Sequence, residues 1–176
     1  MSASAHSDRT GSFTGVPAAQ AGAVLEINLA ALAANYRILS RRAGGAECAA
    51  GLKGDACGLG AAQVGPTLAR QGCRSFFVAH VGEGVALRQI LGPQPAIYVL
   101  HGPWPDTEDD FLANALIPVL NTPEQIEQWS RMGRSQARSL AAALHLDTGM
   151  ARLGLSADEA AALAAAPERL AGIDLR

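Results

Sequence analysis

Short apolar runs alternate with longer segments of helical spacing along most of this chain. Such an alternation is typical of βα units, in which each strand of a parallel sheet is followed by a helix. The sequence predicts strands at residues 48–52, 75–79, 96–100, 117–120 and 139–146, and the start of a sixth at 173–176. It predicts a helix after each of the first five, at residues 61–71, 82–91, 106–115, 124–132 and 156–166, the last two with Thr122 and Ser156 as N-caps. We therefore expect an α/β fold.

A further strand and helix are predicted before these units. Residues 23–27 are apolar enough to form a strand, and Asn28 is a suitable N-cap for a helix that runs to about residue 42. The first 22 residues are rich in Ser, Ala, Gly and Thr and lack the continuous apolar core of a secretory signal. We expect a disordered leader over residues 1–22 and one folded domain over residues 23–176.

The number of βα units suggests a fold class. A (β/α)8 TIM barrel needs eight strands and typically about 250 residues. This chain has 176 residues and about five βα units, so we predict an incomplete (β/α)8 barrel with an added N-terminal strand and helix. An open doubly wound sheet of five or six strands is the alternative. Both folds alternate strands and helices, so the count of elements does not separate them.

The composition argues against a nucleic-acid or membrane partner. The formal net charge is −2, and no cluster of Lys and Arg would attract a phosphate backbone or lipid headgroups. No uninterrupted apolar run reaches the roughly 20 residues that span a bilayer. Cys48, Cys57 and Cys73 form neither a C-x-x-C pair nor an even disulfide framework, which fits a reducing compartment. We expect a soluble, cytoplasmic protein without a metal site.

The first segment with chemical potential is G-L-K-G-D-A-C-G-L-G at residues 51–60. Lys53 stands at the carboxyl end of a predicted strand, where α/β folds place active sites, and a glycine-rich turn follows it. A lysine amine held in such a place can form a Schiff base with an aldehyde. The alternative is an ordinary lysine that projects into solvent at a strand end.

The second segment is H-L-D-T-G-M-A-R-L-G at residues 145–154, between the fifth strand and its helix. Asp147 and Thr148 can hydrogen-bond the backbone of this turn, and Gly149 and Gly154 admit unusual dihedral angles. The planar guanidinium of Arg152 suits a carboxylate or a phenolate. The alternative is a structural turn whose arginine makes a weak surface ion pair.

The two segments together resemble alanine racemases. These enzymes carry a lysine motif of the form A-V-V-K-A-D-A-Y-G-x-G and, later in the chain, D-T-G-M-x-R-L-G. Residues 51–60 and 147–154 are similar to the two motifs and occur in the same order. Residues 26–35 also resemble the family's opening strand and helix, with Asn28 where aspartate is usual. The resemblance extends from about residue 23 to the end of the sequence.

The resemblance implies an isomerase that converts L-alanine to D-alanine, a cell-wall precursor, with pyridoxal 5′-phosphate as cofactor. It implies that Lys53 binds the cofactor covalently and acts as one catalytic acid/base, and that Arg152 lies beside the substrate carboxylate. The second acid/base in this family is a tyrosine from the C-terminal domain of the partner subunit of a homodimer. Tyr36 and Tyr98 are the only tyrosines here, and neither matches that position.

Three departures from the family pattern bear on activity. Cys57 replaces a tyrosine that helps to hold the cofactor phosphate, and a thiol is the poorer hydrogen-bond donor. His145 stands where many members have a carbamylated lysine that braces the arginine, so the bracing here is expected to be different or missing. The third departure is length, which indicates a fragment without the C-terminal domain and its tyrosine. The alternatives are a related amino-acid racemase of broader specificity, since neither motif reads the substrate side chain, or an inactive chain that serves as a binding or dimerising module.

Overall fold

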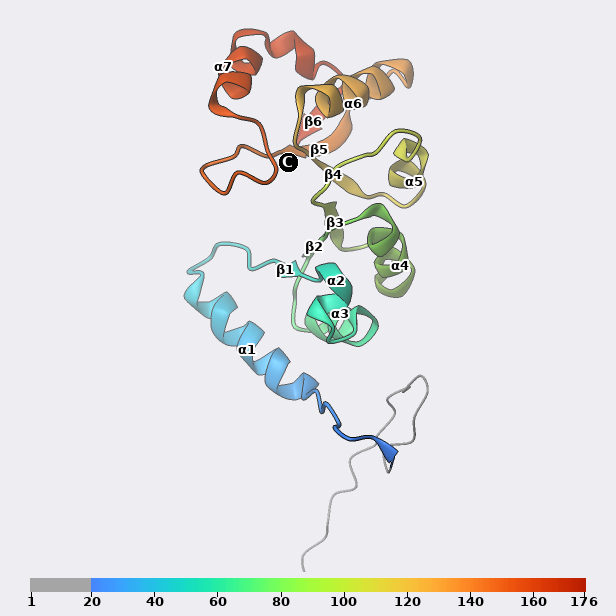
Figure 1. The fold of residues 1–176 in the computed structure, drawn as a ribbon, viewed down its shortest axis with the longest axis vertical. Coiled ribbons are helices and arrows are strands. Elements are labelled where there is room, and N and C mark those ends of the chain that lie inside the picture. Colours follow the sequence, from blue (N-terminus) through green and yellow to red (C-terminus); the bar gives the residue numbers. More distant parts are fainter. Residues whose placement is uncertain (1–19) are drawn as a thin grey trace, which may run out of the picture.

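A computed structural model describes residues 20–176 as six parallel strands, each of which pairs with the next in chain order (Figure 1). The strands are β1 (Ala50–Gly51), β2 (Ser75–Val78), β3 (Ala96–Val99), β4 (Ile117–Leu120), β5 (Leu140–Leu144) and β6 (Ile173–Leu175). An open doubly wound sheet reverses its strand order at a switch point, whereas barrel strands pair in sequence. The order β1 to β6 therefore supports the predicted barrel-type fold and excludes the doubly wound alternative.

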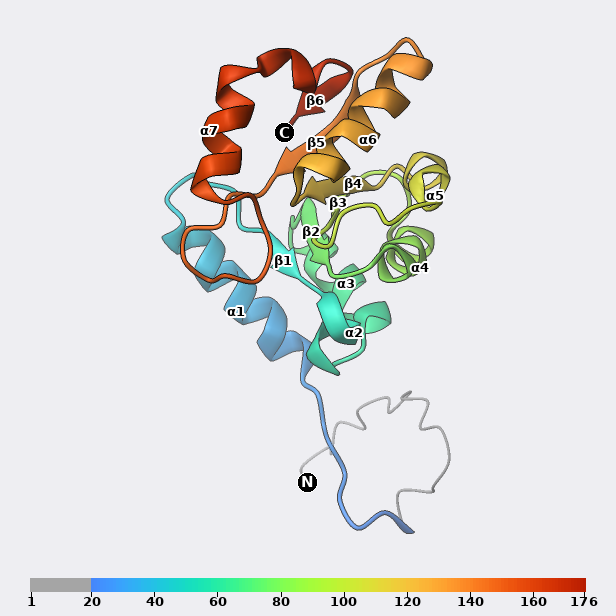
Figure 2. The same ribbon diagram turned by 45° about the horizontal axis from the view of Figure 1, so that its top comes forward.

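Helices connect the strands and lie outside the sheet. They are α1 (Leu29–Arg42), α2 (Lys53–Cys57), α3 (Ala61–Arg70), α4 (Val81–Leu91), α5 (Glu108–Ala113), α6 (Pro123–Ser135) and α7 (Ala157–Ala165), with a 3-10 helix, η2 (Pro167–Leu170), before β6. In both views α3, α4 and α5 lie along one side of the strands, as expected when every crossover has the same hand (Figure 2). No helix among residues 20–176 is both long and apolar enough to cross a membrane.

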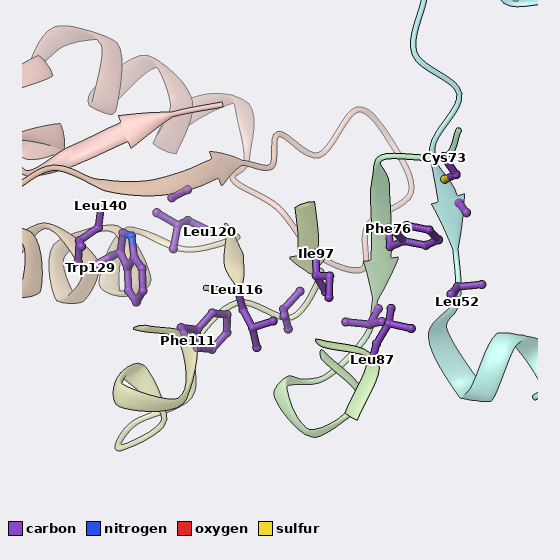
Figure 3. Packing of buried hydrophobic residues seen from close by; sticks show 14 of the residues in the cluster. Leu52, Cys73, Phe76, Leu87, Ile97, Phe111, Leu116, Leu120, Trp129 and Leu140 are labelled. Atoms are coloured by element: carbon purple, nitrogen blue, oxygen red, sulfur yellow. The ribbon is translucent and has the colours of Figure 1, made fainter. Parts of the chain in front are cut away.

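The main core lies between the strands and these helices. Phe76 and Ile97 on β2 and β3 are fully buried and lie near Leu87 of α4 (Figure 3). Further along the sheet Phe111 packs edge-on against Trp129, with ring centroids 5.8 Å apart. Complete burial of such a side chain contributes about 1.5–3 kcal/mol. These few large side chains therefore supply much of the stability of a chain whose aromatic content is only 5%.

The opposite face of the strands is less covered. Phe77 and Tyr98 occupy paired positions of β2 and β3 and stack with centroids 4.8 Å apart. Because side chains alternate along a strand, both lie on the face opposite to Phe76 and Ile97. This face corresponds to the interior of the barrel, and both side chains are only half-buried.

Three predicted helix starts are confirmed by their caps. Asn28 Oδ1 accepts a hydrogen bond from Ala31 N at 2.9 Å, and the Thr122 hydroxyl accepts one from Gln125 N at 3.3 Å. Ser156 begins α7 with a reciprocal capping box. Each cap satisfies backbone N–H groups that the first helical turn leaves free. Local sequence therefore determines where these helices begin.

Other predictions require correction. The strand at residues 23–27 is wrong, since this segment pairs with no strand in the described structure, and Leu25 is 67% exposed. A strand is stable only when a neighbouring strand takes its backbone hydrogen bonds, and an apolar run does not supply that neighbour. The strands predicted at 48–52 and 139–146 are shorter than expected, and α2 and η2 were not predicted. Residues 1–19 of the expected leader lie outside the part of the chain that the structure describes.

Tyr36 connects α1 to the sheet. Its hydroxyl donates a hydrogen bond to Cys48 O at 2.8 Å, just before β1. Burial, and then the adjacent Cys73 thiol, raise the pKa of Tyr36 to about 12. We therefore expect Tyr36 to ionise at a higher pH than a free tyrosine. Its contribution to the free energy of unfolding should be complete below the pKa of about 10 in the unfolded chain, and it should be lost as the pH rises towards the pKa in the folded chain.

This expectation can be checked by titrating the absorbance of tyrosinate in the unaltered chain and in Tyr36→Phe. The difference between the two curves should have a midpoint near 12. A midpoint near 10 while circular dichroism still reports a folded chain would contradict the described environment of Tyr36.

Candidate functional site

The candidate site lies at the carboxyl ends of the strands, where barrel enzymes bind their substrates. Leu52 N donates to Phe77 O at 2.7 Å, so the pairing of β1 with β2 continues to the residue before Lys53. Lys53 is the only lysine of the chain and is exposed. Among residues 20–176 its amine has no hydrogen-bond or ion-pair partner. It is therefore accessible to a ligand at this edge of the sheet.

An unusual left-handed turn follows Lys53. The φ angles of Gly54, Asp55, Ala56 and Cys57 are 63°, 52°, 56° and 56°. Left-handed helical backbone costs roughly 1–2 kcal/mol for each residue that carries a Cβ atom. Three consecutive non-glycine residues in this region therefore make the turn strained, and such strain is typical of segments that position functional groups.

Side-chain hydrogen bonds hold this turn at two points. Asp55 Oδ1 accepts from the N–H group of Ala61, the first residue of α3, at 2.7 Å. At the near end of the turn Gly54 N donates to Glu83 Oε1 at 2.6 Å. The other oxygen of Glu83 accepts from Ala79 N at 2.7 Å and His80 N at 3.1 Å. The carboxylate therefore joins the turn after β1 to the end of β2.

The pKa of Glu83 reflects these contacts. Burial of the carboxyl group opposes ionisation, but the N–H groups of His80, Gly54 and Ala79 outweigh burial and lower the pKa below its ordinary value. Glu83 is therefore ionised at neutral pH, as an acceptor of three N–H groups requires.

Two histidines lie next to each other beyond β2 and β3. The rings of His80 and His101 meet edge to face, with centroids 4.3 Å apart. Burial, then His80, and then the charge of Arg152 lower the pKa of His101, and Glu83 opposes them. Arg152 follows β5 and His101 follows β3, so both come from loops at the carboxyl ends of these parallel strands.

The loop that carries Arg152 is ordered by Asp147. Asp147 Oδ1 accepts from Gly149 N, Met150 N and Ala151 N at 3.0–3.1 Å. The N–H groups of Ala151 and then Gly149 contribute most to lowering the pKa of Asp147. The role predicted for Asp147 is therefore confirmed, whereas Thr148 makes no such bond in the described structure.

Glycine is required at the end of this loop. Gly154 has a φ of +104°, and a Cβ atom there would lie 2.9 Å from Asp147 N and 3.1 Å from the His145 ring. Arg152 itself is exposed and has no hydrogen-bond or ion-pair partner among residues 20–176. The alternative of a surface ion pair is therefore not observed, and the guanidinium is accessible.

His145 binds Asn121 and does not brace Arg152. Its Nδ1 lies 2.8 Å from Asn121 Oδ1. Asn121 Nδ2 donates to Leu100 O and Val119 O, each at 2.9 Å, so Oδ1 is the acceptor and His145 Nδ1 carries the proton. Asn121 was missed in the sequence, where it is the residue before a helix cap and gives no motif signal.

The remaining candidates lie apart from this group or at its edge. Cys57 shares the left-handed turn with Lys53, and its thiol is exposed. Tyr36 bonds near the amino end of β1, and Tyr98 stacks within the sheet, so neither projects from the carboxyl ends of the strands. No cluster of three or more His, Cys, Asp and Glu side chains in residues 20–176 is arranged for a metal ion.

Comparisons with known proteins agree with this geometry. Residues 27–176 match the family described as "Alanine racemase, N-terminal domain". The chain is 54% identical over 143 residues to an alanine racemase of Methylobacterium sp. (strain 4-46). The matched residues make up 81% of this chain and 39% of the relative. The chain is also 43% identical over 161 residues to a catabolic alanine racemase of Mesorhizobium japonicum, covering 92% of this chain and 42% of the relative.

A solved structure shares the same arrangement of strands and helices. It is an alanine racemase from Bartonella henselae with covalently bound pyridoxal phosphate, and it matches with a TM-score of 0.81 and 34% identity. The match covers 85% of this chain and 43% of that protein. This chain therefore spans about two fifths of the length of the relatives that it matches.

Proposed function

The chain belongs to the alanine racemase family, and from that premise we propose that it supplies the lysine-bearing side of an active site that interconverts L- and D-alanine. The proposal rests on one observation above all. Lys53, the only lysine of the chain, is exposed at the carboxyl end of β1, and a strained turn fixes the backbone directly after it. Barrel enzymes place their catalytic groups at this end of the strands.

The residues present fit pyridoxal 5′-phosphate as cofactor. The amine of Lys53 has no partner among residues 20–176, so it is free to bind pyridoxal phosphate covalently. The Bartonella henselae relative is described with covalently bound pyridoxal phosphate. We propose that Cys57, in the same turn, lies beside the phosphate. Its thiol is a weaker donor than a hydroxyl group, so the phosphate is expected to be held less firmly on this side.

The chemistry required of this chain follows from racemisation. Pyridoxal phosphate supplies, when bound, a sink for the electron pair that remains when the Cα proton leaves. We propose that Lys53 holds the cofactor and exchanges the Cα proton on its own face. The free guanidinium of Arg152 can orient the substrate through a two-pronged contact with its carboxylate.

A second acid/base group must act on the opposite face of Cα. Tyr36 and Tyr98 do not lie at the carboxyl ends of the strands, so neither is suited to this role. We propose that a tyrosine of a partner subunit provides it in a homodimer, as the family resemblance implies. The three free cysteines fit a reducing compartment, and we propose that the protein acts in the cytoplasm in the biosynthesis of D-alanine.

Cys57 also favours a second candidate, a chain that retains the fold but has lost catalysis. If the phosphate is not held, the cofactor will not remain bound, and the chain would serve only as a binding or dimerising module. Cofactor binding at Lys53 separates the two candidates.

We predict that Lys53 is labelled when the chain is incubated with pyridoxal 5′-phosphate and reduced with borohydride. The linkage should absorb in the visible before reduction, and peptide mapping should then find the label at residue 53. The test is sharp because Lys53 is the only lysine, so the terminal amine is its only competitor. Lys53→Ala is the control. Equal labelling of the unaltered chain and Lys53→Ala would reject the proposal in favour of the module.

A further inference from the structure

We propose that Glu83 is the positioning residue for Lys53, a role that rests on the proposed function of this site. Its carboxylate binds the backbone directly after Lys53 and so fixes where the lysine side chain leaves the sheet. Gly54 N donates to Glu83 Oε1 at 2.6 Å, although the two residues are 29 positions apart in sequence. Both carboxylate oxygens of Glu83 accept from backbone N–H groups, so Glu83 acts through the position of Lys53.

Glu83 is well placed to hold the turn because it is itself anchored. It occupies the first turn of α4, and its Oε2 accepts from Ala79 N and His80 N at the end of β2. The pairing of β1 with β2 ends just before Lys53, with Leu52 N bonded to Phe77 O. The carboxylate therefore continues the connection between these strands past their last backbone hydrogen bond.

The strain of the turn gives this anchor its importance. Asp55, Ala56 and Cys57 all occupy the left-handed region, which residues with a Cβ atom avoid. Without a partner for Gly54 N, the segment would relax towards ordinary backbone angles and the direction of Lys53 would change. A side-chain amine reaches its target only if its backbone is fixed, since small displacements of a reacting group cost large factors in rate.

The first turn of α6 shows that the residue type at this position matches the loop that it binds. Gln125, in the first turn of α6, accepts from Asn121 N at 2.8 Å and donates through Nε2 to His101 O at 2.9 Å. That loop presents a carbonyl group, which needs the N–H donor of an amide. Gly54 presents an N–H group, which needs an acceptor, and a carboxylate has acceptors only. Glutamate at 83 and glutamine at 125 therefore match the loops that they hold.

Glu83→Gln tests the proposal with little change in size. The amide can keep one accepting oxygen but not two, so either the turn or the helix cap loses its partner. Glu159→Gln is the matched control, because Glu159 holds the same position in α7 and accepts from Ser156 N at 2.8 Å without contact to the turn. Two measurements are made on the whole chain: the affinity of Lys53 for pyridoxal phosphate, and amide hydrogen exchange at Gly54.

We expect Glu83→Gln to weaken the linkage of pyridoxal phosphate at least about tenfold, as loss of a charge-assisted hydrogen bond would, and to speed exchange at Gly54. Glu159→Gln should change neither, because Glu159 bonds only Ser156 and does not contact the turn after Lys53. An unchanged affinity in Glu83→Gln, or an equal loss in both variants, would overturn the proposal.

Two further outcomes are also decisive. If circular dichroism shows that Glu83→Gln is unfolded, Glu83→Asp takes its place, because the shorter carboxylate keeps its charge at the start of α4 but does not span to Gly54. If the unaltered chain forms no linkage at all, the proposed function fails, and exchange at Gly54 still decides whether Glu83 holds the turn.

Discussion

Replacing Gly133 with alanine should lower the melting temperature of this chain by about 5–10 °C, the shift expected for a loss of about 2–3 kcal/mol in a chain of this size. Gly133 lies within α6, where a Cβ atom would clash with Gly172 O and would lie 3.0 Å from Arg138 O. Both neighbours are backbone atoms, so no flexible side chain can move aside. The helix must shift away from the sheet or the segment before β6 must move.

Moving that segment would break other contacts. Gly172 O accepts from Leu140 N at 3.0 Å, a bond that joins the start of β5 to the turn before β6. The Ser130 hydroxyl of α6 donates to Ala171 O at 2.6 Å. Alanine is a better helix former than glycine by about 1 kcal/mol, which works in the opposite direction but is smaller than the expected steric cost. The net effect is therefore destabilising.

Gly82→Ala is the matched control for this prediction. Gly82 also lies in a helix, α4, but a Cβ atom there would have no neighbour within 4 Å. We expect this substitution to leave the melting temperature unchanged or to raise it slightly, as measured by thermal unfolding followed by circular dichroism. Gly133→Ala with the same stability as Gly82→Ala would contradict the close approach of α6 to Gly172.

Sequence alone does not distinguish these two glycines. They illustrate which features of the fold could be predicted from sequence and which could not. The order of strands and helices, and the caps Asn28, Thr122 and Ser156, depend on residues near one another in the chain and were predicted correctly. The contact of Gly133 with residue 172 depends on the packing of distant segments. The strand at residues 23–27 was wrong for a similar reason, since its existence depends on a partner elsewhere.

The same distinction applies to the site. Lys53 and Arg152 could be proposed as site residues because each follows a strand within a recognisable motif, and parallel strands bring their carboxyl ends to one edge. Glu83 and Asn121 belong to no such motif, and the bonds that connect them to other loops reach partners more than twenty residues away. The left-handed turn was also missed, because three of its residues carry Cβ atoms and one of the bonds that hold it comes from Glu83, which is distant in sequence.

Arg152→Lys should lower kcat/KM for alanine by about 10- to 100-fold, the range expected when one strong hydrogen bond to a charged group is lost. The measurement requires an active racemase that contains these residues. Lysine keeps the positive charge but not the planar fork that contacts both oxygens of a carboxylate. A loss of this size would therefore indicate that the geometry of the guanidinium matters in addition to its charge.

The stability of the same variant separates substrate binding from a structural role. Arg152 is exposed and has no hydrogen-bond or ion-pair partner among residues 20–176, so its replacement should change the free energy of unfolding by no more than about 0.5 kcal/mol. The loop keeps its shape through Asp147 and Gly154, neither of which depends on Arg152. Arg74→Lys, at an exposed position before β2, is the control and should leave both quantities unchanged. A large fall in melting temperature with undiminished kcat/KM in Arg152→Lys would reverse the assignment, because it would mean that the guanidinium holds the loop and does not contact the substrate.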